Sequence, residues 1–288
     1  MNDMLRSPAT SPIAAAYEKD GCFFPYDVTG EAEAAGLLAD LEAAEAELGN
    51  DRARLSLLRS YPSQLLPSFA GLIRHPRLIE AVSQIIGPDV LVWSCGFFIK
   101  EPGSKSYVSW HQDLNYWGLD GDQEVTAWYA LTPATVENGC MRFVAGSHRR
   151  KDVPHVDKFA PDNLLTRGQE IAVEVDEANA VNVLLRAGQA SFHHGHMFHA
   201  SGPNRTNSRR LGVAIRYVAP SMKQVSGDRL LVSRVSGEDR YGHFEHMPAP
   251  AGRLLADDFE RARRNAEMKR EILYKGVKPD LVKENRRA

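Results

Sequence analysis

The fold of this chain is decided where a helical pattern gives way to a strand pattern, at residues 89–100, which read DVLVWSCGFFIK. Their β-branched and aromatic side chains form two short strand-like runs, at 90–93 and 95–99. Further runs follow, separated by Gly, Pro, Asn and Asp, at residues 125–131, 141–144, 170–175, 181–185, 189–192 and 211–218. These runs, about eight in all, are too closely spaced for crossover helices. The sequence therefore predicts a mostly antiparallel double sheet or barrel rather than a doubly wound α/β fold.

Helical patterns lie on both sides of this β region. Residues 30–48 carry apolar side chains at helical spacing and are followed by Gly49. Residues 76–86 begin with Pro and end before a Gly-Pro stop, and residues 256–275 return to helical spacing. The stretch before residue 89 as a whole is predicted to be helical. We therefore expect a mainly β core with flanking helices.

A chain of 288 residues corresponds to one or two domains of roughly 150 residues. We expect a single domain over residues 1–288, because the candidate site residues described below come from both halves of the chain. Its expected parts are a helical region over about 1–88, a β core over about 89–220, and a lid with a C-terminal helix over about 221–288. Residues 104–109 and 221–250 are candidate lids, since long irregular stretches beside a rigid β core often carry function.

The composition narrows the class of protein. With 43% hydrophobic residues, 25% charged residues and a formal charge of -2, the chain has the composition of a soluble globular protein without a basic nucleic-acid-binding surface. It shows neither a signal-peptide pattern nor an apolar run of about 18 residues. Its three cysteines are too scattered for a disulfide framework. We expect a cytoplasmic monomer or homodimer that binds a small molecule, with no membrane and no nucleic-acid partner.

A candidate metal site begins in the segment WHQD at residues 110–113. In an extended chain alternate residues point to the same side, so His111 and Asp113 can present an imidazole and a carboxylate to one metal ion. Two ligands are too few, and a His-x-Asp pair is a weak signal by itself. A third ligand from a distant strand would complete the two-His, one-carboxylate triad that leaves positions open on iron(II).

The third ligand is sought in residues 192–204, FHHGHMFHASGPN, which hold four of the ten histidines. His199 precedes a Gly-Pro-Asn turn and the strand-like run at 210–217, so a hairpin would place that run beside His199. His194 and His196 remain alternatives on the residues alone, and His193 is more simply a structural or pocket residue.

The run at 210–217 also offers a candidate anion site. Arg210, Gly212, Ala214 and Arg216 share one face of the predicted strand, and the residues between them are apolar. Two guanidinium groups separated by small residues leave room for an anion, because arginine binds carboxylates through two parallel hydrogen bonds.

Together these motifs resemble the phytanoyl-CoA dioxygenase family of iron(II)- and 2-oxoglutarate-dependent oxygenases. The motifs that carry the resemblance are WHQDLNYW at 110–117, TAW at 126–128, ENGCM at 137–141, GSH at 146–148, HASGPN at 199–204, and Arg210. The resemblance covers about residues 90–220 and implies a double-stranded β-helix, or jelly roll, with helices packed outside.

The resemblance also implies roles for individual residues. The family's iron ligands fall on His111, Asp113 and His199, and the arginine that binds the far carboxylate of 2-oxoglutarate falls on Arg210. Ser201 lies where a hydroxyl often assists that carboxylate. Further candidate contacts come from the segments that build the family's pocket: Lys100 and Trp128 for the cosubstrate, and Gln112, Asn115, Tyr116, Arg142 and Arg216 for the substrate.

The implied reaction is hydroxylation of an unactivated C–H bond of a small molecule. Iron(II), dioxygen and 2-oxoglutarate would take part, with succinate and CO2 as products and ascorbate as a candidate reductant. Related halogenating enzymes carry Ala or Gly in place of the metal-binding carboxylate, so the presence of Asp113 favours hydroxylation over halogenation. Desaturation and ring closure stay open as outcomes.

Two other classes of function fit the same residues. A hydrolase or isomerase could use the His/Asp/His set with Zn²⁺ or Mn²⁺, and a jelly roll could bind a ligand without catalysis. A nucleic-acid demethylase is disfavoured by the charge of -2. The run His148-Arg149-Arg150-Lys151 is either a solvated loop or a rim that attracts an anionic substrate.

Overall fold

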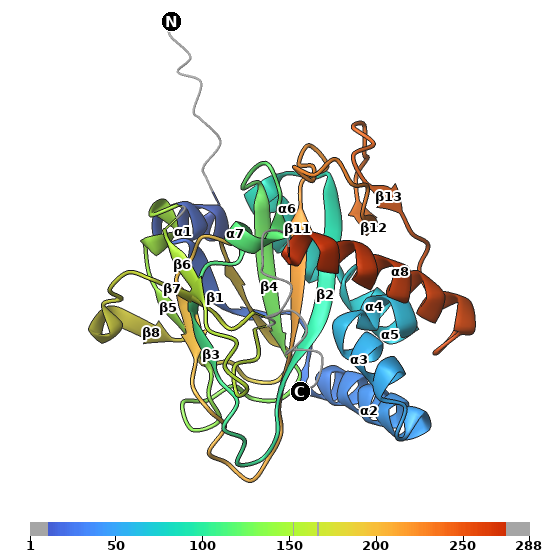
Figure 1. Ribbon diagram of the computed structural model, residues 1–288, viewed down its shortest axis with the longest axis horizontal. Helices are drawn as coiled ribbons and strands as arrows, with labels where there is room; N and C mark the ends of the chain where they lie inside the picture. The colour runs from blue at the N-terminus through green and yellow to red at the C-terminus, as the bar shows by residue number, and fades with distance from the viewer. Residues whose placement is uncertain (1–10, 152, 166, 275–288) are drawn as a thin grey trace, which may run out of the picture.

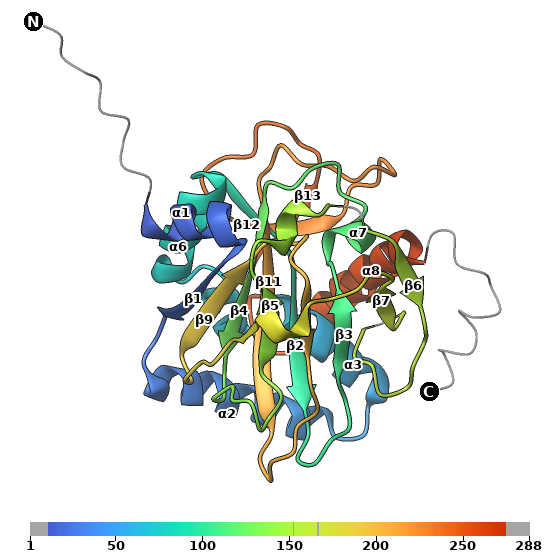
Figure 2. The same ribbon diagram turned by 90° about the vertical axis from the view of Figure 1, so that its left-hand side faces the viewer.

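The computed structural model describes residues 11–151, 153–165 and 167–274. Two sheets stand face to face in it, as Figures 1 and 2 show. The major sheet has the strand order β1 (Cys22–Asp27), β9 (Gln189–His193), β4 (Glu124–Ala130), β11 (Arg210–Val218), β2 (Val90–Lys100), β12 (Leu231–Ser236) and β13 (Glu245–His246). The minor sheet has the order β3 (Val108–His111), β10 (His199–Ser201), β5 (Met141–Val144) and β8 (Ala180–Asn182). A separate pair joins β6 (His155–Asp157) to β7 (Gln169–Ile171).

All of these pairings are antiparallel except that of β12 with β13. The expected mainly β double sheet is therefore confirmed. The helices that surround it are α1 (Pro12–Asp20), α2 (Glu31–Leu48), α3 (Arg52–Ser60), α4 (Pro62–Leu65), α5 (Pro67–Leu72), α6 (Pro76–Ile86), α7 (Leu114–Trp117) and α8 (Ala256–Leu273). The helices expected at residues 30–48, 76–86 and 256–275 correspond to α2, α6 and α8; residue 275 lies outside the described residues. No helix of the described ranges is long and apolar enough to cross a membrane.

The largest core lies between the outer face of the major sheet and the helices α1 to α6 and α8; of these, α2 to α5 and α8 gather on one side of the molecule in Figure 1. Alternate side chains of β11, such as Val213 and Ile215, point into this core, which also contains Leu41 of α2 and Phe69 of α5. Each such fully buried side chain contributes roughly 1.5–3 kcal/mol. The helices therefore fix the major sheet from behind and leave its other face for the site.

The opposite face of the major sheet packs against the minor sheet. Trp128 of β4 and Ala214 of β11 meet Met141 and Phe143 of β5 in this second core. The residues of β11 that the sequence placed on one face do share it, since Arg210, Ala214 and Arg216 all line one cavity between the sheets. Many of the residues that line the cavity between the two sheets are polar or charged.

The predicted hairpin after His199 is wrong. The strand β10, which holds His199, pairs with β3 and β5 in the minor sheet, whereas β11 pairs with β2 and β4 in the major sheet. The chain crosses from one sheet to the other over residues 202–209. His199 and β11 therefore face each other across the sandwich instead of lying side by side.

Other differences concern strands inside regions predicted to be helical or irregular. The strand β1 lies in the N-terminal stretch that the sequence assigned to helices, and β12 lies in the candidate lid at 221–250, where it extends the major sheet. The other candidate lid overlaps the start of β3. The two runs at 90–93 and 95–99 form one continuous strand, β2. The strands predicted at 170–175 and 181–185 correspond to β7 and β8, which are shorter than predicted.

Candidate active site

Three side chains with metal-binding chemistry meet between the sheets. His111 ends β3 and lies directly opposite His199 in the antiparallel pairing of β3 with β10, with ring centroids 4.0 Å apart. Asp113 follows two residues after His111, and its backbone N–H donates to the Gly195 carbonyl at 2.7 Å. One ligand atom from each of the three side chains lies within 4.8 Å of the others, and all three residues are buried.

The hydrogen bonds of the two imidazoles favour a metal ion in this place. His111 Nδ1 lies 2.9 Å from the Ser109 carbonyl and 3.1 Å from the His199 carbonyl, while His111 Nε2 lies 3.2 Å from Asp113 Oδ1. Both ring nitrogens thus face acceptor oxygens only, although a neutral imidazole carries a single N–H. A cation between Nε2 and Oδ1 would resolve this conflict. The residues therefore fit a bound metal.

His199 is oriented in the same way. Its Nδ1 lies 2.9 Å from the Met197 carbonyl, an arrangement that fixes the ring and leaves Nε2 as a ligand atom. Burial, together with the neighbouring His111 and His193, lowers the pKa of His199 well below its usual range, so the ring is neutral. A neutral imidazole is the form that binds a metal.

Asp113 is held in its charged form. Burial alone would raise the pKa of its carboxyl, but Arg216 and the contact with His111 lower this pKa well below its usual range. Arg216 Nε lies 3.5 Å from Asp113 Oδ2. The carboxylate is thus available as an anionic ligand at neutral pH.

The other histidines of the cluster lie differently. Within the described ranges, His111, Asp113 and His199 form the only group of three His, Cys, Asp or Glu residues with donor atoms this close. His194 instead faces Asp122 and Glu124, at 3.9 and 3.7 Å. His196 is buried beside His194, their ring centroids 5.6 Å apart. This placement favours His199 over either of them as the third ligand.

Two buried basic side chains form the other end of the site. Arg210, the first residue of β11, lies opposite Lys100, the last residue of β2. Arg210 is 2% exposed; its Nη2 donates to the Gly139 carbonyl at 3.0 Å, and its Nε has no hydrogen-bond partner among the described residues. Burial lowers the pKa of Arg210 to about 10.

Lys100 is fully buried next to this guanidinium. Its Nζ donates to Ser201 Oγ at 2.7 Å and to the Gly202 carbonyl. Burial, with Arg210 as a second cause, lowers the pKa of Lys100 to about 6. Neither Arg210 nor Lys100 forms an ion pair with a carboxylate in the described part of the chain. Buried charges are normally paired, so the unpaired guanidinium of Arg210, with the Lys100 amine beside it, fits an anionic ligand.

A glycine and a tryptophan hold Arg210 in place. The Arg210 guanidinium carbon lies 5.3 Å from the ring centroid of Trp128, in the range of a cation–π contact. The Trp128 ring passes so close to β11 that a Cβ built at Gly212 would lie 1.8 Å from it. Gly212 therefore leaves the space that Trp128 needs in order to pack under Arg210.

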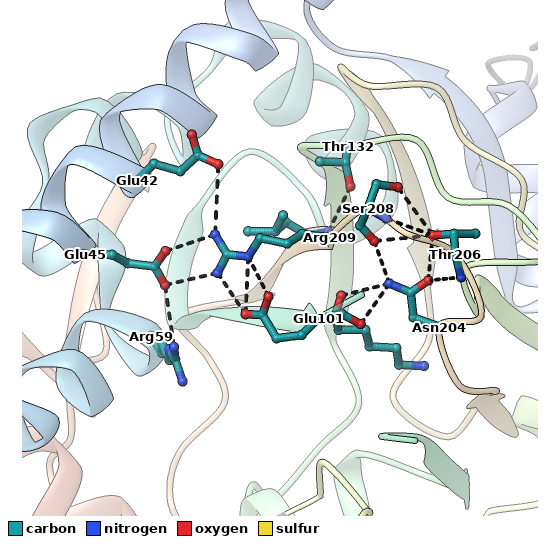
Figure 3. Close-up of polar contacts among 11 residues, drawn as sticks. Glu42, Glu45, Arg59, Glu101, Thr132, Asn204, Thr206, Ser208 and Arg209 are labelled. Atoms are coloured by element: carbon teal, nitrogen blue, oxygen red, sulfur yellow. Dashed lines mark hydrogen bonds and ion pairs between the residues drawn. The ribbon is translucent and has the colours of Figure 1, made fainter. Parts of the chain in front are cut away.

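The preceding residue, Arg209, points the opposite way. It binds Glu45 of α2 and Glu101 on the outside of the sheet, as Figure 3 shows, at 3.0 Å in each case. The amide of Asn204 ties the same turn together by donating to the carbonyls of Lys100, Glu101 and Ser208. These contacts lie outside the cavity, whereas the next side chain along the strand, that of Arg210, points into the interior.

The cavity between the sheets is lined by both ends of the site. His111, Asp113, His199, Ser201, Arg210 and Arg216 all line it. Several buried polar atoms around it have no hydrogen-bond partner among the described residues: Thr126 Oγ1, both ring nitrogens of His193 and Arg210 Nε. Because buried polar atoms are normally hydrogen-bonded, such a concentration indicates that a polar ligand belongs in this cavity.

Several predicted substrate contacts do not reach this cavity. Gln112 donates to the carbonyls of Arg150 and His196 at 2.8 Å and so braces two loops. Asn115 lies in a different surface hollow, and Arg142 binds Glu177 on the outside of the minor sheet. Tyr116 and Arg216 do line a larger second cavity next to the first one. The side chains of Gln112, Asn115 and Arg142 line neither cavity.

The basic run at 148–151 is also placed elsewhere. His148 and Arg149 contact the Glu18 carbonyl, and Lys151 binds Asp122. All of these residues border a hollow beside α1 that shares no lining residue with the two cavities near the triad. The run therefore does not form a rim of the candidate site.

His193, expected as a structural or pocket residue, lines the first cavity, as does Thr126 of the TAW motif. The sequence did not single out some other residues that line the cavities, such as Phe98, which borders both of them. Lys269 lines the second cavity from α8. A lysine in a charged helix carries no sequence signal of its own, and only the packing of α8 on the sheet brings it to this place.

With this geometry in hand, comparison with known proteins assigns the family. A family model described as phytanoyl-CoA dioxygenase (PhyH) matches residues 17–212. The chain belongs to the phytanoyl-CoA dioxygenase family. This membership confirms the resemblance found in the motifs, and with it the jelly-roll fold.

Individual relatives extend this assignment. The probable alpha-ketoglutarate-dependent hypophosphite dioxygenase of Stutzerimonas stutzeri is 25% identical over 193 residues, which are 66% of this family member and 66% of that protein. The rat peroxisomal phytanoyl-CoA dioxygenase is matched over 46% of its length. The chain thus spans about half to two thirds of the length of these curated relatives.

Solved structures match over more of the chain. The apo structure of ThoJ, a non-heme monooxygenase, superposes with a TM-score of 0.83 at 34% identity and covers 92% of this family member and 98% of that chain. CytC3, solved with Fe(II) and alpha-ketoglutarate, has a TM-score of 0.59 at 20% identity over 83% of this chain and 98% of its own, and shows the fold alone. Iron and alpha-ketoglutarate, or 2-oxoglutarate, are the pair expected from the motifs.

Proposed function

We propose that this chain is an Fe(II)- and 2-oxoglutarate-dependent oxygenase that hydroxylates a C–H bond of a small molecule and releases succinate and CO2. One observation carries the proposal. The His/Asp/His triad and the buried Arg210, which has no carboxylate partner among the described residues, line the same cavity, and Lys100 donates to Ser201, which lines that cavity too. A metalloprotein that used the triad alone would have no use for a buried Arg210 and Lys100.

His111, Asp113 and His199 would hold the iron. Three protein ligands of this kind leave positions on iron(II) for 2-oxoglutarate and dioxygen. When bound, iron and 2-oxoglutarate supply the oxidising chemistry, which a protein side chain cannot provide. The chain supplies the orientation of the three ligands through the Ser109, Met197 and His199 carbonyls.

Arg210 would bind the far carboxylate of 2-oxoglutarate, with help from Lys100 and Ser201. The guanidinium presents an unused Nε into the cavity, and the Ser201 hydroxyl already accepts from Lys100, so its own O–H can donate to a carboxylate. Trp128 holds the guanidinium from one side. Binding of a dianion would also stabilise the charged form of Lys100, whose pKa burial lowers to about 6.

The apolar lining of the cavity would keep water out. Phe98, Val108 and Met141 separate the polar groups, and Ala214 leaves space between the two arginines of β11. A dry cavity strengthens each charge-assisted contact and protects a reactive oxidant from side reactions. In this arrangement the chain binds, orients and shields, while the metal and the cosubstrate react.

Anaerobic binding tests this proposal before the substrate is known. We expect one Fe(II) per chain, and 2-oxoglutarate binding that tightens when Fe(II) is present, measured by calorimetry. His111→Ala should lose Fe(II) binding, and Arg210→Ala should keep Fe(II) but bind 2-oxoglutarate weakly. Binding of Zn²⁺ without any effect on 2-oxoglutarate would instead support a hydrolase or isomerase.

The remaining expectations stay predictions of the same proposal. The chain would act as one domain over residues 1–288, in the cytoplasm, as a monomer or homodimer. The shared core of helices and major sheet supports the single domain, because α2, α5 and α8 contribute to it together. Size-exclusion chromatography with light scattering would give the oligomeric state directly.

A further inference from the structure

A second and larger cavity continues from the triad toward α8. Its volume is about 330 Å³, and Phe98, Asp113 and Arg216 line both this cavity and the one between the sheets. Residues from β2, α7 and α8 form its walls. The cavity therefore extends from α8 to the candidate metal ligand Asp113. The substrate of an oxygenase must lie beside the metal, and this cavity offers such a place.

Six aromatic residues line this cavity. Trp93 and Trp117 stack on each other with ring centroids 5.1 Å apart and planes 26° from parallel. The complete set of aromatic lining residues is Tyr61, Trp93, Phe97, Phe98, Tyr116 and Trp117. Together these aromatic side chains give the cavity apolar walls, and such walls suit a flat apolar or aromatic ligand.

Positive charge dominates the same lining. Arg59, Arg216 and Lys269 are its cations, and Asp113 is its only carboxylate among the described lining residues. Arg216 lies beside Asp113, at 3.5 Å, and Arg59 turns toward Glu45, at 3.6 Å. Lys269 has no carboxylate partner in the described ranges. One charge in the cavity is therefore left for a ligand.

Lys269 is also held in a defined position. Its Nζ donates to the Trp93 carbonyl at 2.6 Å and lies 4.5 Å from the Trp93 ring centroid and 5.5 Å from that of Tyr61. An ammonium has three N–H donors, and the Trp93 carbonyl accepts only one of them. The remaining donors can bind an anion in the cavity.

We propose that this cavity binds the substrate, and that the substrate is an aromatic carboxylate whose anionic group sits on Lys269. This inference rests on the proposed oxygenase function, which makes the cavity beside Asp113 the place of the substrate. The aromatic walls hold the flat part of the molecule. Its far end reaches toward Asp113 and Arg216.

The experiment measures binding of a defined probe to the intact chain without iron or 2-oxoglutarate. The probe is 3-phenylpropanoate, and its neutral counterpart is 3-phenylpropanamide; dissociation constants come from ligand-observed NMR titrations. We expect the wild-type chain to bind the carboxylate at least tenfold more tightly than the amide. Lys269→Met should abolish this preference, Lys269→Arg should retain it, and the surface control Lys223→Met should leave it unchanged.

Three results would overturn the inference. One is a wild-type chain that binds neither probe, or binds both equally. Another is a Lys269→Met variant that is folded, as judged by circular dichroism, and still prefers the carboxylate as strongly as the wild-type chain. Lys269 would then be a purely structural contact between α8 and the sheet. The third is loss of the preference in Arg210→Ala but not in Lys269→Met, which would place the probe in the cavity between the sheets.

The outcome is separable from that of the proposed function. Because no iron or cosubstrate is present, the binding result does not depend on oxygenase activity. A chain that forms succinate but does not prefer the carboxylate would retain the function and lose the inference. A chain that prefers the carboxylate but neither binds iron nor forms succinate would be a binding protein for this class of ligand.

Discussion

Arg209 and Arg210 are neighbours in the sequence but meet opposite surroundings. The Arg209 side chain is 24% exposed and binds Glu45 and Glu101, whereas Arg210 is 2% exposed and has no carboxylate partner among the described residues. The alternation of a strand produces this difference, since successive side chains point to opposite faces. The two arginines therefore provide a matched pair of variants.

Arg210→Ala should weaken binding of 2-oxoglutarate by about 30-fold or more, because loss of one partner of a buried charge pair costs roughly 2–5 kcal/mol. Calorimetric titration of the Fe(II)-loaded chain measures this change. Arg209→Ala should leave the affinity for 2-oxoglutarate within about twofold and lower the free energy of unfolding by about 1 kcal/mol. Equal effects of the two variants on 2-oxoglutarate would refute the assignment of Arg210.

Lys269 gives a prediction about pH. Burial, with the nearby Arg216 as a second cause, lowers the pKa of Lys269 to about 7. The groups that face its ammonium, Cys95 and Tyr61, have pKa values raised by burial, to about 12 for Cys95, and stay neutral near pH 7. The empty cavity therefore loses a positive charge as the pH rises through about 7.

We expect 3-phenylpropanoate to bind about tenfold more weakly at pH 8 than at pH 6, since only protonated Lys269 attracts the carboxylate. Lys269→Arg should remove this dependence because arginine stays charged over the range. NMR titrations at the two pH values provide the comparison. A wild-type affinity that rises with pH would contradict the role of Lys269.

Among single residues, the sequence predicted those that belong to motifs. The two-residue spacing of an extended chain made His111 and Asp113 candidates, and the face of a strand made Arg210 one; the resemblance to the family then assigned their roles. Lys269 belongs to no motif, and Gln112 looked like a pocket residue only because its neighbours are. Whether a side chain faces a cavity depends on packing between elements, which a local pattern does not contain.

The element β11 shows how packing adds to the local pattern. The sequence predicts the strand and its two faces, yet the close approach of the Trp128 ring to Gly212 arises only when β4 lies beside β11. A Cβ at Gly212 would meet the Trp128 ring at 1.8 Å. The glycine thus supports the site through the tryptophan under Arg210.

Gly212→Ala should displace Trp128, lower the free energy of unfolding by about 1–3 kcal/mol and weaken binding of 2-oxoglutarate. Chemical denaturation followed by tryptophan fluorescence, together with calorimetry, measures both effects. Gly36→Ala in α2 is the control, because no atom lies within 4 Å of a Cβ built there. That variant should be slightly more stable, by about 0.5–1 kcal/mol. A Gly212→Ala variant that behaves like the control would show that Gly212 does not support the site through Trp128.

The strand β1 shows why one element was missed. Its sequence, CFFPYD, contains Pro25, and a proline inside a short apolar run argues against a central strand. β1 lies at the edge of the major sheet, where a missing N–H costs little. By contrast, α2 and α6 were predicted well because glycine follows each of them and their apolar stripes are long enough to identify a helix.

For the whole molecule, the sequence predicted a double sheet but not which strands pair in each sheet. The strand-like runs and the short connections between them were enough to favour a double sheet. The predicted hairpin failed because a jelly roll passes consecutive strands between its sheets, and strand pairing over such distances leaves no local trace. His111 and His199 become neighbours through this pairing, although 88 residues separate them in the chain.

In the proposed function, the chain oxidises its substrate with iron bound at the His/Asp/His triad and 2-oxoglutarate as cosubstrate. The most direct measurement is succinate formed from 2-oxoglutarate under air, with Fe(II) and ascorbate added to the metal-free chain. We predict succinate above background for the wild-type chain and for His246→Ala, a surface histidine of β13, and none for His111→Ala. Absence of succinate from an iron-loaded wild-type chain, or undiminished succinate from His111→Ala, would contradict the claim.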